Sequence, residues 1–168
     1  MNFKKNAKLP KYFIIDVDGV LTDGKFYYSE DGKIIKAFGV DDHDALKYIS
    51  KFLSVQIISA DSSGFSITKK RIVDHMKFPL DLVPVENREK WIRDSFNLNE
   101  CIYMGDGLFD PAIFDVVMYS ITPNNALSVT KRKANFVTKS NGGDRAVAEA
   151  CMHLLEKFFG VKAKNIYK

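Results

Sequence analysis

Long apolar runs and cysteine are both scarce in this sequence of 168 residues, and each scarcity excludes a class of protein. No apolar stretch approaches the roughly 20 residues that cross a bilayer, and the opening MNFKKNAKLP lacks the apolar core of a signal peptide. The two cysteines, Cys101 and Cys151, are too few for a disulfide framework. Both stand among apolar residues, which favours two buried thiols over a single disulfide. We therefore expect a cytoplasmic protein with no membrane partner.

Charge is nearly balanced except at the two ends of the chain. The net charge is +4, from 25 Lys and Arg against 21 Asp and Glu. Lysines gather at both ends: Lys4, Lys5, Lys8, Lys11, Lys157, Lys162, Lys164 and Lys168. Such ends could touch nucleic acid or acidic lipid, but no interleaved aromatic residues accompany them. We interpret them as solvated termini and expect no nucleic-acid partner.

Short apolar runs alternate with helical stretches, without repeats or linkers. Buried strands are expected at 12–15, 55–58, 80–83, 101–104, 116–121 and 136–138, and helices at 42–52, 66–76, 87–96 and 146–159. Two alternating runs, 25–28 and 33–38, flank the turn residues Ser29-Glu30-Asp31-Gly32 and predict a β-hairpin flap. The pattern predicts an α/β fold: one Rossmann-like, three-layer domain with a central parallel sheet. We treat residues 1–168 as a single domain with its core at about 11–159.

Acidic residues follow several of the predicted strands. Asp16 and Asp18 follow the first strand, and Asp106 and Asp110 follow the fourth. Ligands of parallel sheets bind beyond the carboxyl ends of the strands, so these four side chains are expected to meet. Packed carboxylates repel one another and take up protons unless a cation lies among them, and oxygen ligands suit Mg²⁺. Any one of these aspartates alone could instead cap a helix or a turn.

The order of the motifs resembles the haloacid dehalogenase superfamily of phosphatases. DxDG follows the first strand, Ser59 the second and GDxxxD the fourth, and a lysine opens a later helix. The resemblance implies that Asp16 is the nucleophile and a Mg²⁺ ligand, and that Asp18 is the general acid/base with its carbonyl on the metal. It also implies that Ser59 holds the phosphoryl oxygens. Asp106 would complete the protein's metal ligands, and Asp110 would support them.

The lysine of this pattern has two candidates at the start of the helix expected at 87–96. Lys90 is preferred, within Asn87-Arg88-Glu89-Lys90-Trp91, and Arg88 is the alternative. A cation there would neutralise charge during attack on a phosphate dianion. Gly19 would let the backbone turn sharply and come close to the phosphate.

The spacing of the motifs leaves no room for a cap domain. About 43 residues separate Asp16 from Ser59, and about 31 separate Ser59 from Lys90. With DVDGVLTDG, a Tyr-rich hairpin and a late GGDRAV, residues 12–158 resemble the 3-deoxy-D-manno-octulosonate 8-phosphate phosphatases and their nonulosonate 9-phosphate relatives. The resemblance implies a homotetramer in which the hairpin packs at an interface and a neighbour's C-terminal segment helps to cover the site. The alternative is a hairpin folded back on its own domain.

Three departures from this family's pattern bear on the substrate. Asp61 stands where the family usually carries Arg, the loop before Asp42 is acidic where the family tends to carry Arg, and Arg145 stands where it usually has Gly. A cation could thus have moved from one wall of the pocket to another, with Arg145 as a carboxylate clamp or, alternatively, in a surface or capping role. Asp42, Asp61, Arg88 and Arg145 are therefore candidate substrate-binding residues.

Together these features predict Mg²⁺-dependent hydrolysis of a phosphorylated sugar acid through an aspartyl-phosphate, in lipopolysaccharide or nonulosonate biosynthesis. One alternative is a phosphatase of another small phosphate monoester; a phosphomutase is disfavoured because it would need a cap to exclude water. Another is a non-catalytic domain that partners a cytidylyltransferase pathway. The presence of both Asp16 and Asp18 argues against the non-catalytic alternative.

Overall fold

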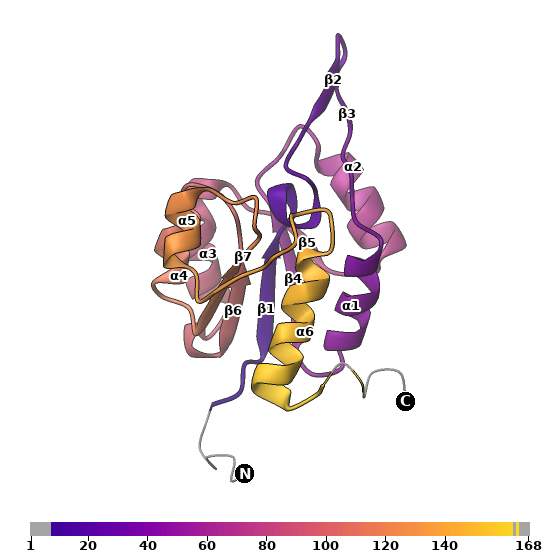
Figure 1. Ribbon diagram of the computed structural model, residues 1–168. Helices are drawn as coiled ribbons and strands as arrows, with labels where there is room; N and C mark the ends of the chain where they lie inside the picture. The colour runs from indigo at the N-terminus through magenta and orange to yellow at the C-terminus, as the bar shows by residue number, and fades with distance from the viewer. Residues whose placement is uncertain (1–7, 163, 165–168) are drawn as a thin grey trace.

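A six-stranded parallel sheet forms the centre of the protein (Figure 1). The computed structural model describes residues 8–162 and 164. The strands lie in the order β5-β4-β1-β6-β7-β8. Their bounds are β1 (Tyr12–Asp16), β4 (Ser54–Ser59), β5 (Leu80–Leu82), β6 (Cys101–Met104), β7 (Tyr119–Thr122) and β8 (Phe136–Val137). The chain therefore runs outward from β1 to one edge and then returns to build the other, so β1 and β6 lie at the point where the direction of winding changes.

Helices cover both faces of this sheet, which explains why its strands are apolar without alternation. On one face lie α1 (Asp41–Ile49), α2 (Phe65–Lys69) with its continuation η2 (Lys70–His75), and α6 (Ala146–Phe159). On the other lie α3 (Arg88–Ser95) and α4 (Asp110–Phe114), with α5 (Ser128–Lys133) packed beside α4. Phe13 and Ile15 of β1 point into the first hydrophobic cluster and Ile14 into the second. The predicted three-layer α/β fold is confirmed.

Short helical turns join several of these elements. They are η1 (Val17–Leu21), η3 (Val85–Asn87) and η4 (Leu98–Glu100). The sequence did not predict α4 and α5, because five or six residues are too few to display a helical period. No described helix has both the length and the apolar character needed to span a bilayer.

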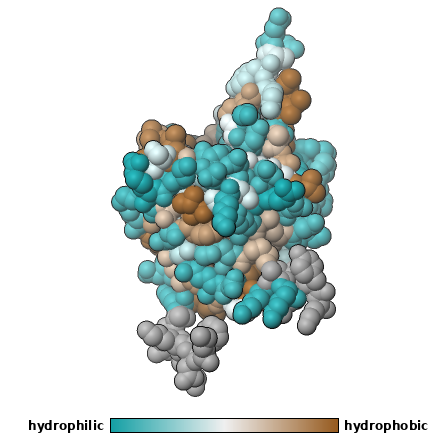
Figure 2. Space-filling model, in the orientation of Figure 1, coloured by the Kyte–Doolittle hydropathy of each residue, from teal (hydrophilic) through white to brown (hydrophobic). Residues whose placement is uncertain are grey.

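The predicted hairpin projects past the ends of the sheet strands, away from the body of the protein (Figure 1). Its strands are β2 (Tyr27–Ser29) and β3 (Gly32–Ile35), paired antiparallel. Tyr28, Ile34 and Ile35 are each more than half exposed, and Figure 2 shows hydrophobic residues along one side of this projection. Below the strands, the bridge between Thr22 and Phe38 closes the base of the hairpin against the body.

The lysine-rich ends are only partly described. Lys8 and Lys11 form ion pairs with Glu100. Lys4, Lys5 and Lys168 lie outside the described residues. The assignment of 1–168 to a single domain stays a prediction.

Candidate active site

The carboxyl ends of β1, β4 and β6 bring the predicted polar residues to one cavity of about 440 Å³. Asp16 is the last residue of β1, and Asp18 lies in the turn η1 that follows. Asp106 and Asp110 come after β6, with Asp110 at the start of α4. All four aspartates line the cavity. The predicted meeting of these side chains is what the structure shows.

Three of these carboxylates are close enough to share a cation. Oxygen atoms of Asp16, Asp106 and Asp110 all lie within 4.8 Å of one another. Burial, opposed by Arg88 and reinforced by Asp110, raises the pKa of Asp16 to about 6. Burial, together with the charges of Asp16 and Asp110, raises the pKa of Asp106 to about 7. An all-oxygen cluster that resists ionisation fits a hard divalent cation such as Mg²⁺.

Gly19 makes room for one of these carboxylates. Its φ angle is +93°, and a Cβ atom there would lie 2.0 Å from Oδ2 of Asp106. Any side chain at this position would displace Asp106 from the cluster. The predicted turn at Gly19 is therefore confirmed, and the reason includes contact with Asp106 as well as backbone freedom.

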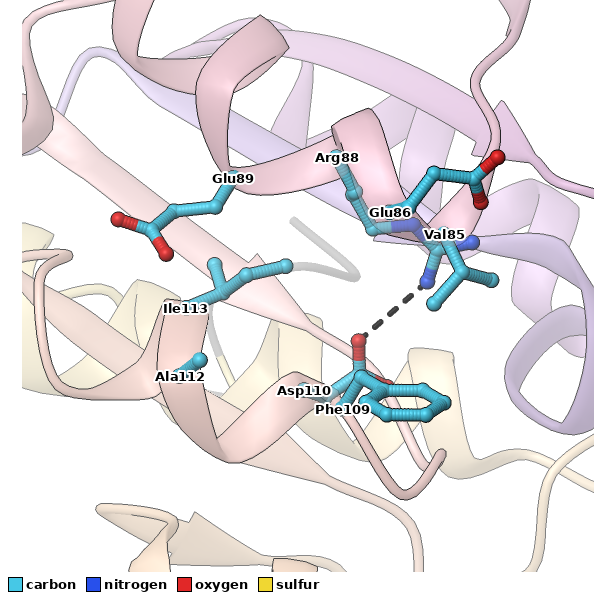
Figure 3. A pocket seen from close by; sticks show the side chains of 8 residues that line it. All are labelled: Val85, Glu86, Arg88, Glu89, Phe109, Asp110, Ala112 and Ile113. Atoms are coloured by element: carbon cyan, nitrogen blue, oxygen red, sulfur yellow. Dashed lines mark hydrogen bonds and ion pairs between the residues drawn. The ribbon is translucent and has the colours of Figure 1, made fainter.

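Arg88 is the cation that lies against the nucleophile candidate. Its guanidinium is buried, with Nη1 2.7 Å from Oδ2 of Asp16 and Nη2 3.3 Å from Oδ1. Nη1 also donates to the hydroxyl of Tyr103 and to Asp110. Figure 3 shows Arg88 of α3 reaching towards Asp110 of α4. The planar fork of arginine can hold several acceptors at once, which suits this crowded position.

Lys90, which the sequence analysis preferred over Arg88, lies elsewhere. Its side chain is 78% exposed and pairs with Asp94 one turn further along α3. Successive helical residues are about 100° apart, so residues 88 and 90 point to nearly opposite sides of the helix. The structure corrects the preference: the residue of this segment that reaches the cavity is Arg88.

Asp18 is held from two sides. The hydroxyl of Ser59 donates to its Oδ2 over 2.9 Å, and the ammonium of Lys36 lies 2.7 Å from its Oδ1. Lys36 also pairs with Asp61 and donates to Thr68. Sequence reasoning missed Lys36, because a lysine next to a hairpin strand ordinarily points into solvent. The sequence carried no signal of its burial.

The other three candidates for substrate binding have different positions. Asp61 lines the cavity, but the ammonium groups of Lys33 and Lys36 hold its Oδ2, and its Oδ1 accepts from the hydroxyl of Ser63 and the amide of Gly64. Both of its carboxyl oxygens therefore have partners within the protein, ion pairs at Oδ2 and hydrogen bonds at Oδ1.

Asp42 and Arg145 lie outside this cavity, so the structure corrects their assignment to the substrate site of the protomer. Asp42 is buried in α1, where its Oδ1 accepts from the amide of Ala148 and caps α6. Arg145 is exposed, immediately precedes α6 and pairs with Asp41 and Asp144. It lines a groove between α1 and α6 instead.

Comparisons with known proteins found similar sequences and structures, although no family model matches the chain. The chain is 30% identical over 155 residues to the 3-deoxy-D-manno-octulosonate 8-phosphate phosphatase KdsC of Salmonella typhi, covering 86% of this chain and 79% of that protein. The cobalt-bound form of the corresponding Haemophilus influenzae phosphatase has a TM-score of 0.79 at 25% identity, covering 95% of this chain and 97% of that one. The Moraxella catarrhalis enzyme, in complex with magnesium, phosphate and KDO, has a TM-score of 0.73 at 26% identity, covering 88% and 86%.

Fold, acidic cluster and relatives together define a phosphatase of the haloacid dehalogenase superfamily, an enzyme that hydrolyses a phosphate monoester. Within it, the chain belongs to the 3-deoxy-D-manno-octulosonate 8-phosphate phosphatase family.

Proposed function

We propose that this enzyme is a Mg²⁺-dependent phosphatase of a phosphorylated sugar acid and that it works through an aspartyl-phosphate on Asp16. The observation that carries the proposal is the setting of Asp16. Its carboxylate ends the central strand, pairs with Arg88 and lies within 4.8 Å of two further carboxylates, in the same cavity as Asp18. A carboxylate becomes an effective nucleophile towards phosphate when cations neutralise the charges around it, and this position offers them.

The metal would be held by the carboxylates of Asp16 and Asp106 and by the backbone carbonyl of Asp18. Asp110 would support this group, because it accepts from the amide of Gly107 over 2.7 Å and from the hydroxyl of Tyr103, also over 2.7 Å. When bound, Mg²⁺ would supply charge neutralisation for the transferring phosphoryl group. Both magnesium and cobalt occur in the similar structures, so the choice of Mg²⁺ is part of the proposal.

The side chains divide the reaction between them. Asp16 attacks phosphorus and the bond to the leaving oxygen breaks, while Asp18 gives its proton to that oxygen. Asp18 then takes a proton from the water that attacks the aspartyl-phosphate, which releases phosphate and restores Asp16. Arg88 would hold the phosphoryl oxygens, whose charge spreads in the transition state. Ser59, predicted for this task from the sequence, is buried and donates the single proton of its hydroxyl to Asp18 instead.

The substrate class follows from the relatives and stays broader than one sugar. The Moraxella catarrhalis relative binds KDO and phosphate, which supports a sugar acid such as 3-deoxy-octulosonate 8-phosphate. Nonulosonate 9-phosphates are the second candidate. Asp61 stands where the family usually carries Arg, which is why we propose the class of substrate and not one compound.

We also propose a homotetramer built on the hairpin. Tyr28, Ile34 and Ile35 leave an exposed apolar side on a two-stranded ribbon, and such a ribbon gains stability by packing against another surface. Location in the cytoplasm stays a prediction.

Phosphate release tests the proposed function. Wild type and Asp16→Asn are assayed with 3-deoxy-octulosonate 8-phosphate, a nonulosonate 9-phosphate and p-nitrophenyl phosphate, with Mg²⁺ or with a chelator. We expect Mg²⁺-dependent release that Asp16→Asn loses by at least about 10³-fold. If wild type releases no phosphate from any of the three esters, the proposed function is wrong.

A further inference from the structure

Lys36 is a buried lysine attached to the most exposed part of the fold. Its side chain has 0% exposure, whereas Ile34 and Ile35 of the preceding strand are 51% and 54% exposed. Lysine is almost never fully buried unless its charge is paired. Here the isoleucine side chains are exposed and the lysine side chain after them is buried, which is the reverse of the ordinary pattern. The residues that surround the ammonium of Lys36 must therefore account for its burial.

Two carboxylates and one hydroxyl surround the ammonium. The Nζ atom of Lys36 lies 2.7 Å from Oδ1 of Asp18, 2.8 Å from Oδ2 of Asp61 and 2.8 Å from Oγ1 of Thr68. The first two contacts are ion pairs and the third is a hydrogen bond, and the fully buried side chain of Lys36 is not among the residues that line the cavity. Any effect of Lys36 on the reaction must therefore pass through one of these residues.

Asp18 is the partner through which such an effect would reach the reaction. Its side chain is only 18% exposed, and its two carboxyl oxygens have different neighbours: Ser59 at Oδ2 and Lys36 at Oδ1. A side chain that transfers a proton works only when it is held in the correct geometry, and a carboxyl on a turn has two torsions that must be fixed. The hydrogen bond at Oδ2 and the ion pair at Oδ1 together restrict both torsions.

We propose that Lys36 is a positioning residue that holds Asp18 in the geometry for protonating the leaving oxygen, and that Asp61 anchors Lys36 for this task. The inference rests on the proposed function of Asp18. If Lys36 has this role, the base of the hairpin, which lies outside the sheet, supports the proposed acid Asp18. The inference also gives Asp61 an internal role, since its oxygens are occupied by Lys33, Lys36, Ser63 and Gly64.

Lys33 provides a matched control within the same hairpin. Its Nζ atom lies 2.5 Å from the same Oδ2 of Asp61, and its side chain is 2% exposed. It also lies over the ring of Phe26, 3.3 Å from the centroid. Among the ion pairs of the described residues, Lys33 has one with Asp61 and none with Asp18. Replacing either lysine removes a buried cation that docks the hairpin on Asp61, but only Lys36 touches the proposed acid.

The experiment measures how strongly the rate depends on the leaving group. Values of kcat/KM are determined with Mg²⁺ for p-nitrophenyl phosphate, whose phenolate leaves without a proton, and for phenyl phosphate, which needs more help from an acid. This constant reports the step in which the ester bond breaks and not the later attack of water. The ratio of the two constants is independent of the fraction of folded enzyme, because both substrates sample the same preparation.

We expect Lys36→Met to raise the ratio of p-nitrophenyl to phenyl phosphate at least about tenfold, as Asp18→Asn also does, because acid catalysis is worth about 10²–10⁴-fold when it is complete. Lys33→Met leaves the ratio within about twofold of wild type, and Lys36→Arg returns it towards the wild-type value. If Lys36→Met does not fold, Asp61→Asn tests the same link, because it removes the anchor of Lys36; its ratio is expected to rise about threefold.

Two outcomes would overturn the inference and leave the proposed function standing: a wild-type ratio in Lys36→Met beside a raised ratio in Asp18→Asn, or equal rises in Lys33→Met and Lys36→Met. With Lys36→Met unfolded, a wild-type ratio in Asp61→Asn would overturn it in the same way. A wild-type ratio in Asp18→Asn would remove Asp18 as the acid and the inference with it. No release from either aryl phosphate by wild type would overturn both the inference and the proposed function.

Discussion

The two halves of the cavity are built in different ways. Asp16 pairs with Arg88 at the start of α3, and Arg88 in turn donates to Tyr103 of β6 and Asp110 of α4, so this group comes from the sheet and its helices. Around Asp18, the sheet contributes Ser59, but the cation is Lys36 from the hairpin. The proposed nucleophile is therefore held by the core of the fold, whereas the proposed acid depends on a projecting ribbon. Changes in the core should affect every substrate alike, and changes at the hairpin base should affect poor leaving groups most.

Among these comparisons, the largest effect is expected from replacing Arg88, the cation beside Asp16. Arg88→Met should lower kcat/KM for p-nitrophenyl and phenyl phosphate by a similar factor, about 10²–10³-fold, because it removes charge from the transferring phosphoryl group. Lys90→Met should stay within about twofold of wild type, since its exposed pair with Asp94 contributes little. Steady-state kinetics check both. A larger loss of kcat/KM in Lys90→Met than in Arg88→Met would contradict the assignment of Arg88 as the cation of the site.

Metal binding should distinguish Asp106 from surface carboxylates. Asp106→Asn is expected to weaken Mg²⁺ binding by at least about tenfold, because it removes a ligand from the acidic cluster. Asp115→Asn, a change at an exposed residue paired with Lys133, is the control and should leave the affinity unchanged. Isothermal titration calorimetry of the metal-free protein with MgCl₂ measures both, and equal affinities for the two variants would exclude the proposed site.

The stability of the metal-free enzyme should fall as pH rises. Burial first, and neighbouring carboxylates second, raise the folded-state pKa of Asp16 to about 6 and that of Asp106 to about 7, against an ordinary value of 3.8. Between about pH 4 and pH 7 the folded state therefore binds more protons than the unfolded state, so the free energy of unfolding decreases with pH, by up to about 7 kcal/mol.

Urea unfolding with a chelator at pH 5 and at pH 7.5 measures this change. Asp106→Asn should flatten the dependence on pH, and saturating Mg²⁺ should stabilise the wild type most at the higher pH. A metal-free protein that gains stability between pH 5 and pH 7.5 would contradict the account of the cluster.

The smallest effect on the protomer is expected at the tip of the hairpin. Ile34→Ser removes an exposed apolar side chain, so the stability of the protomer should change by less than about 0.5 kcal/mol. Its ratio of p-nitrophenyl to phenyl phosphate should equal that of wild type, in contrast with Lys36→Met two residues away. Light scattering should at the same time show a smaller assembly if the tip forms the interface. A mass equal to that of wild type would contradict the proposed interface at the hairpin.

The sequence was sufficient for the sheet and for the acidic cluster because both depend on short-range patterns. Apolar runs mark buried strands, and carboxylates that follow parallel strands must meet at one edge. The choice between Arg88 and Lys90 depends on the rotational phase of α3. The apolar Trp91 and Ile92, three and four residues after Arg88, indicate that phase and were the signal that could have favoured Arg88. A sequence shows that a helix begins near a residue more reliably than it shows which side chain faces inward.

Lys36, Asp42 and Arg145 depend on contacts that are distant along the chain. Lys36 is buried only because the hairpin base meets Asp61 and Thr68. Asp42 caps a helix that begins about a hundred residues later, at Ala146. Arg145 faces Asp41 across the groove between α1 and α6. Local patterns carry no record of such pairings, so these positions required the structure.

The central claim is that Asp16 carries the phosphoryl group, and trapping it is the most direct test. Asp18→Asn should still transfer the group from p-nitrophenyl phosphate, which needs no proton for its leaving group, but should lose activation of the attacking water. Rapid acid quenching and peptide mass spectrometry should then find one phosphoryl group on the peptide that contains Asp16, only when Mg²⁺ is present. Asp16→Asn in the same background should show none. A phosphoryl group on any other residue, or nitrophenol release in Asp18→Asn with no phosphorylated peptide, would contradict the account.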